Sequence, residues 1–186
     1  MKLVVLFSAM TLAWNAAIAA EPAAAMKKHT AKSVAPVPAA ASAAKAVPSA
    51  IPGVIKMPIG KGIKIDEAVE SMKLRANYHN MKLVAELPLS KQVEAMTGKT
   101  QRFMTIYQFC DALTAKQMVD TSVEFAAYLP CRIAVIEDAQ GQGWLVMTDL
   151  NPLINTAGLT PALKTRAIEV RDQLESIMKA GAAGEL

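Results

Sequence analysis

The chain has 186 residues, enough for one domain with additional sequence around it. Its content of 53% hydrophobic and 19% charged residues excludes a disordered protein and a multi-span membrane protein. Two cysteines exclude a disulfide-dense miniprotein and a four-cysteine zinc site. The formal net charge is +4, and its distribution along the chain determines which partners it favours.

The first 19 residues have the pattern of a secretory signal peptide. Lys2 supplies the positive start, residues 3–14 are almost entirely apolar, and Ala17-Ile18-Ala19 fits a cleavage site. The alternative is a membrane anchor, but the apolar run is shorter than the roughly 20 residues that a spanning helix needs. We therefore expect cleavage after about Ala19, a periplasmic location and no stable membrane span in the mature protein.

Residues 20–50 are rich in alanine and proline and show no apolar periodicity, which predicts a flexible tether. They carry four lysines and one glutamate, and Lys2 in the signal peptide supplies the remaining positive charge. Residues 51–186 are therefore electrically neutral overall. This balance argues against a nucleic-acid-binding domain.

The folded domain is expected over residues 51–186, a length that can bury one hydrophobic core. Residues 51–65 predict an irregular or edge strand, with 63–65 as its paired part. A helix then begins at Asp66 and runs through Ala76. Residues 81–87 predict a second strand, and Ser90 begins a short helix that Gly98 ends.

The middle of the domain alternates strands and helices. Residues 102–110 form the clearest strand, because apolar side chains alternate along it, and Asp111 begins a helix through Val119. The apolar residues 123–129 are expected to be packed. Residues 131–137 and 144–148 predict the two arms of a hairpin.

A long helix is predicted at the end of the chain. Thr160 caps it, Pro161 occupies its first position, and Gly181 ends it. Its apolar stripe consists of Leu163, Ala167, Val170, Leu174 and Ile177. This stripe fits a helix that covers a sheet, and it leaves a homodimer open as an alternative.

Three features carry a resemblance to a known family. These are Phe109-Cys110-Asp111 after a strand, the run 129–135 (Leu-Pro-Cys-Arg-Ile-Ala-Val), and Glu137-Asp138 followed by Gly141. Over about residues 63–149 the chain resembles the domain-of-unknown-function 302 (DUF302) family. The resemblance implies an α+β fold: a curved antiparallel sheet of about four to five strands with helices on one side, as in the TATA-binding protein. It implies no established reaction.

The chain departs from many members of that family at one position. Those members carry a histidine near the end of the second strand, where this chain has Glu86-Leu87-Pro88. A ligand role for that histidine therefore does not transfer to this protein.

Cys110 ends one predicted strand and Cys131 begins another, so both sulfurs are expected at the same end of the sheet. By alternation they would share a face with Ile106 and Ile133. An oxidising periplasm favours a structural disulfide, which would stabilise the fold by roughly 3 kcal/mol. The first alternative is a redox-active thiol pair, for which Arg132 beside Cys131 and the helix start beside Cys110 would favour a thiolate.

The second alternative is a copper(I) site. Cys110 and Cys131 would bind the metal together with the thioethers of Met118 and Met147, since soft sulfur ligands select copper(I). Most methionines of the domain fall on apolar stripes, where methionine usually fills the core.

Aromatic residues on one strand provide further candidates. Phe103, Tyr107 and Phe109 alternate along residues 102–110, and together with Arg132 they are candidates for lining a ligand pocket; core packing is the competing interpretation. His79 is the sole histidine of the domain, and no Gly-x-Ser-x-Gly motif accompanies it, so a hydrolase has little support.

The sequence therefore predicts an exported accessory or binding domain without an identified enzymatic activity. Its partner would be a periplasmic protein or a small ligand. No cofactor is indicated, with copper as the alternative.

Overall fold

The computed structural model describes residues 51–185. The predicted signal peptide and tether lie outside this range. Five strands form one antiparallel sheet in the order β1-β5-β4-β3-β2. The strands are β1 (Val54–Pro58), β2 (Lys82–Leu87), β3 (Met104–Cys110), β4 (Cys131–Glu137) and β5 (Gly143–Thr148). The helices are α1 (Ile65–Tyr78), α2 (Leu89–Thr97), α3 (Ala112–Thr121), the 3-10 helix η1 (Val123–Tyr128), α4 (Asn151–Thr156) and α5 (Pro161–Ala183).

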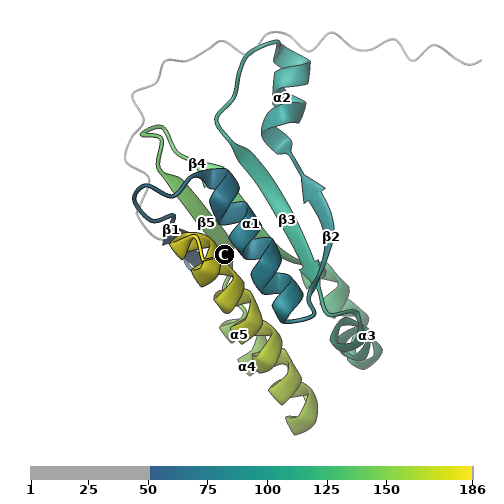
Figure 1. Ribbon diagram of the computed structural model, residues 1–186. Coiled ribbons are helices and arrows are strands. Elements are labelled where there is room, and N and C mark those ends of the chain that lie inside the picture. The colour runs from purple at the N-terminus through teal and green to yellow at the C-terminus, as the bar shows by residue number, and fades with distance from the viewer. Residues whose placement is uncertain (1–50, 186) are drawn as a thin grey trace, which may run out of the picture. The chain divides into compact units, whose positions relative to one another are not determined.

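The two long helices cover one face of the sheet. Figure 1 shows α1 and α5 lying alongside each other across the strands, with α2 near one end of β3 and α3 near the other. The predicted α+β architecture, an antiparallel sheet with helices packed on it, is confirmed.

The strand register determines which side chains face these helices. Tyr107 lies opposite Ile133, and Val135 lies opposite Leu145, so every second residue of β3, β4 and β5 points to the helix layer. These side chains are buried and join α1 and α5 in a single core. The largest fully buried side chains are Phe109, Met72, Met81, Ile133, Leu145, Leu174, Ile177 and Met178.

The first strand differs from its prediction. The paired residues are Val54–Pro58, and Ile65 begins α1 instead of ending a strand. The Glu67 carboxylate accepts a hydrogen bond from the Lys64 backbone N–H at 3.2 Å, which satisfies an N–H group at the helix start. Residues 59–64 form the connection, and the Gly60 N–H donates to the Ala182 carbonyl at 2.8 Å.

The last helix also differs from its prediction, because Gly181 does not end it. Gly181 is buried inside α5, and the left-handed residue that ends the helix is Gly184, with φ 63°. A Cβ atom on Gly181 would lie 2.5 Å from Met72 Cγ and 3.1 Å from the Ala68 carbonyl oxygen. The missing side chain therefore allows α1 and α5 to approach closely.

This close approach predicts an unusual response to substitution. Gly181→Ala should lower the free energy of unfolding by about 1–3 kcal/mol, because the added methyl group overpacks the core. Replacing glycine by alanine inside a helix normally stabilises it by roughly 0.5–1 kcal/mol, so the sign of the change is diagnostic. Urea denaturation of both proteins measures it, and a more stable variant would show that the two helices are not packed this tightly.

Candidate functional site

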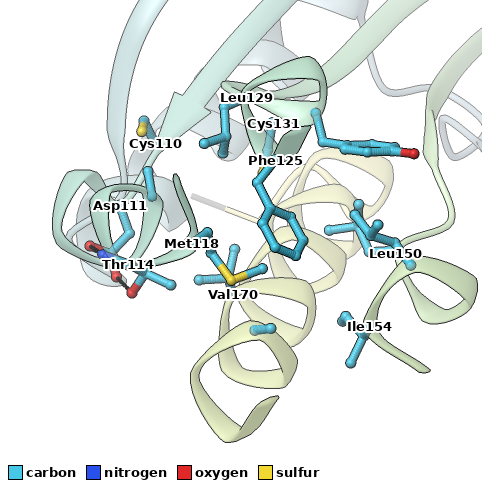
Figure 2. Close-up of a pocket in the computed structure, with 14 residues that line it drawn as sticks. Cys110, Asp111, Thr114, Met118, Phe125, Leu129, Cys131, Leu150, Ile154 and Val170 are labelled. Atoms are coloured by element: carbon cyan, nitrogen blue, oxygen red, sulfur yellow. Dashed lines mark hydrogen bonds between the residues drawn. The ribbon is translucent and has the colours of Figure 1, made fainter. Parts of the chain in front are cut away.

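A largely apolar cavity lies between α3, η1, α4 and α5, beside the end of β3 and the start of β4 (Figure 2). Its volume is about 60 Å³, and it is partly open to solvent. Its lining consists of Cys110, Asp111, Thr114, Ala115, Met118, Phe125, Tyr128, Leu129, Cys131, Leu150, Leu153, Ile154, Ala167 and Val170. An apolar lining with a few polar groups is typical of sites that bind small molecules.

Asp111 fixes one wall of the cavity by capping α3, as the sequence predicted. Its carboxylate accepts hydrogen bonds from the N–H groups of Leu113 at 3.1 Å and Thr114 at 3.3 Å, and from the Thr114 hydroxyl at 2.7 Å. Burial acts to raise the pKa of Asp111, but the hydrogen bonds from Thr114 and Leu113 and the charge of Arg166 hold that pKa below its usual value. The one carboxylate on the cavity wall is therefore ionised and already satisfied by hydrogen bonds.

Both cysteines line this cavity, but they do not share a face of the sheet as the sequence suggested. The register places Phe109 opposite Cys131, so Cys131 lies on the same helix-covered face of the sheet as Ile133. Cys110 is the last residue of β3, one position beyond Phe109, where the chain turns into α3. Both thiols are unpaired, so the expected disulfide is not present in the structure.

The environment of both thiols favours their neutral form. Burial raises the pKa of Cys131 from an ordinary value of 9.0 to about 11, and the nearby Cys110 adds to this shift, whereas Arg132 opposes it weakly. Burial and the Asp111 carboxylate also raise the pKa of Cys110. A redox-active cysteine needs a lowered pKa, so these surroundings disfavour the thiol-redox interpretation.

Only one of the two predicted methionine ligands lies with both cysteines. Met118 lines the same cavity, whereas Met147 is buried in the core and lines a neighbouring hollow with Cys131. Within residues 51–185, no group of three or more histidine, cysteine, aspartate or glutamate side chains is placed to hold a metal ion. A soft-metal site would therefore depend on Cys110, Cys131 and Met118.

The predicted ligand-lining residues lie elsewhere. Tyr107 and Phe109 are buried in the main core, and Phe103 packs against its edge. Arg132 is exposed and borders the neighbouring hollow that Cys131 and Met147 also line. The structure does not bring these four residues into one pocket.

One whole wall of the cavity was not predicted from the sequence. Leu153 and Ile154 come from the short helix α4, which was not predicted, and Leu150 directly precedes it. Pro152 in the first turn of α4 is a signal that marks helix starts and could have identified it. Phe125, whose ring faces the cavity in Figure 2, belongs to the apolar run that was expected to be packed.

A cluster of polar side chains, which was not predicted from the sequence, joins α1 to α5. The His79 ring Nε2 and the Ser176 hydroxyl oxygen are 3.0 Å apart, and Arg75 Nη1 lies 3.5 Å from the same hydroxyl. Arg75 also pairs with Glu185 at 2.8 Å. Burial and the charge of Arg75 lower the pKa of His79. The cluster links the C-terminal end of α1 to the C-terminal half of α5. Ser176 does not line the apolar cavity.

The fold and cavity together define a class of protein: a single α+β domain with an open antiparallel sheet and an apolar cavity at one end. None of the helices in residues 51–185 combines the length and the apolar character needed to cross a membrane.

The family model described as "Domain of unknown function DUF302" matches residues 55–181, so the chain belongs to the DUF302 family. The chain is also similar to the crystal structure of an uncharacterized conserved DUF302 protein from Bacillus stearothermophilus. The TM-score is 0.59 at 15% sequence identity, over 70% of this chain and 98% of the other. This likeness supports the fold. No curated protein matches the chain.

The raised thiol pKa values predict slow alkylation that accelerates in alkali. With a pKa near 11 instead of 9, the fraction of Cys131 in the thiolate form at neutral pH is about a hundredfold lower than for an ordinary cysteine. Its reaction with iodoacetamide, followed by mass spectrometry in Cys110→Ser, should be slow at pH 7 and keep rising above pH 9, because burial, the larger cause of the shift, remains. Cys131→Ser isolates the reaction of Cys110 as a comparison. A rate that levels off near neutral pH would reveal a low-pKa thiolate and contradict this account.

Proposed function

We propose that the chain is an exported, non-catalytic binding domain whose cavity holds a small, largely apolar molecule. The observation that supports this most directly is the apolar lining of the cavity between α3, η1, α4 and α5. Burying apolar ligand surface there is favourable by roughly 25 cal/mol per Å².

The chemistry of the lining favours binding over catalysis. The Asp111 carboxylate is engaged by Thr114 and by the start of α3. The two thiols are held in their protonated, weakly nucleophilic form. The cavity wall therefore offers neither an activated nucleophile nor a free general base, but it does offer apolar surface with a few polar atoms at its rim.

Export forms part of this proposal and is supported by the signal-peptide pattern of residues 1–19. The N-terminal residue of protein recovered from the periplasm tests it, since cleavage should follow about Ala19.

Filling the cavity should weaken the binding of a ligand. Ala115→Leu adds a branched apolar side chain to the α3 wall and should weaken binding of the neutral fluorescent probe N-phenyl-1-naphthylamine by about tenfold, which is about 1.4 kcal/mol. Ala95→Leu makes the same change at an exposed position of α2 and should leave the affinity unchanged. Fluorescence titration measures all three proteins.

Two results would contradict the proposal. One is an unmodified protein that does not bind the probe. The other is equal weakening by Ala115→Leu and Ala95→Leu, which would place the probe outside the cavity.

A copper(I) site is the second candidate function. The observation that favours it is that Cys110, Cys131 and Met118 line the same cavity. Both thiols would give up their protons to solvent as copper(I) binds, and the Met118 thioether would be a third soft ligand. Because both thiol pKa values are raised, the affinity should increase with pH.

Competition for copper(I) against a chelator of known affinity distinguishes the two candidates. Binding through these residues should disappear in a Cys110→Ser, Cys131→Ser double variant and weaken in Met118→Leu. Met96→Leu is the matched control, because Met96 is 86% exposed and lies outside the cavity. Undiminished affinity in the double variant would exclude the site.

A further inference from the structure

A second, more polar hollow adjoins the apolar cavity. Cys110, Asp111 and Val170 line both, so the end of β3, the start of α3 and one turn of α5 form the border between them. The second hollow has a volume of about 400 Å³, which is within the usual size of sites that bind small molecules. Most of its other lining residues are polar, and we call it the polar hollow. These polar residues are His79, Asn80, Lys82, Arg166, Glu169 and Gln173.

The charges that line the polar hollow balance one another. Lys82 and Arg166 are positive, whereas Asp111 and Glu169 are negative. Burial lowers the pKa of His79, so its ring is neutral at pH 7 and does not alter this balance. Since recognition depends on complementary charge, a balanced lining favours a ligand that carries one charge of each sign.

These four charges are not all paired with one another. The Arg166 guanidinium lies 2.7 Å from a carboxylate oxygen of Glu169 and 3.8 Å from one of Asp111, so two carboxylates share one cation. Lys82 takes part in no ion pair within residues 51–185. The polar hollow therefore has one surplus negative charge on α3 and α5 and one surplus positive charge on β2.

We propose that the polar hollow and the apolar cavity together bind a small zwitterion with an apolar side chain, such as a branched amino acid. The proposal rests on the proposed function, because the apolar part of the ligand occupies the cavity described there. The Lys82 ammonium group binds the carboxylate of the ligand. The Asp111 carboxylate already accepts three hydrogen bonds within α3, so Glu169 binds the ammonium group of the ligand.

The volume of the apolar cavity selects a short side chain. About 60 Å³ is room for roughly five water-sized groups, at about 10–15 Å³ for each. This suits the branched side chain of leucine and is too little for a long acyl chain. Leucine therefore matches both the charges of the polar hollow and the volume of the cavity.

Isothermal titration calorimetry with leucine and three analogues tests the proposal. Isocaproate lacks the ammonium group of leucine, and isopentylamine lacks its carboxylate. Each should bind about threefold more weakly than leucine, because each loses one exposed ion pair. Glycine lacks the apolar side chain and should bind about tenfold more weakly, or worse.

Two variants assign the charged groups. Lys82→Gln should lower the affinity for leucine to about that for isopentylamine, and Glu169→Gln should lower it to about that for isocaproate. Lys99→Gln and Glu70→Gln are the matched controls, because both residues are exposed and lie outside the polar hollow. Glu70, like Glu169, also pairs with a basic residue three positions away. Both controls should bind leucine as the unmodified protein does.

All four substitutions change exposed side chains, so each variant should fold, and circular dichroism measures this. Equal affinities for leucine, isocaproate and isopentylamine overturn the proposal, as does an equal affinity for leucine in Lys82→Gln and Lys99→Gln. A protein that binds N-phenyl-1-naphthylamine but not leucine overturns this inference alone. A protein that binds neither compound contradicts the proposed function as well.

Discussion

The pairing of β3 with β4 is the constraint on which the other features depend. Tyr107 lies opposite Ile133 and Phe109 opposite Cys131, and these positions carry the side chains that α1 and α5 bury. Because side chains alternate along a strand, a shift of one residue would move the whole buried set to the other face. The same register therefore determines which side chains form the core and which lie on the face of the sheet away from α1 and α5.

The cavity follows from where these two strands end. β3 stops at Cys110, and Asp111 turns the chain directly into α3 by capping it. The chain then returns through η1 to begin β4 at Cys131. The two cysteines are thus brought to one cavity by the ends of neighbouring strands, although their positions in the alternation differ. Burial raises the pKa of both thiols, and the Asp111 carboxylate adds to this shift at Cys110, which disfavours a redox role.

Much of the fold could be predicted from local patterns. The alternation along β3, the cap at Asp111 and the start of α5 at Thr160 and Pro161 are signals carried by a few adjacent residues, and each is confirmed. Gly181 was misread because its role depends on Met72, which is distant in sequence. A helix-ending glycine and a glycine at a helix contact look alike in one sequence.

The candidate site was predicted only in part. Cys110, Cys131 and Met118 were identified from their chemistry, and all three line the cavity. The prediction that Cys110 and Cys131 share one face of the sheet was wrong, because register is a pairing between strands that neither strand encodes alone. The α4 wall and the contact between His79 and Ser176 likewise arise from tertiary packing.

Nuclear Overhauser effects between backbone protons of β3 and β4 test the central claim most directly. In the register described here, Tyr107 should show cross-strand contacts with Ile133, and Phe109 with Cys131. Contacts of Ile106 with Ile133 in their place would mean that the strands pair one residue out of step. The side chains of β3 would then be assigned to the wrong faces of the sheet.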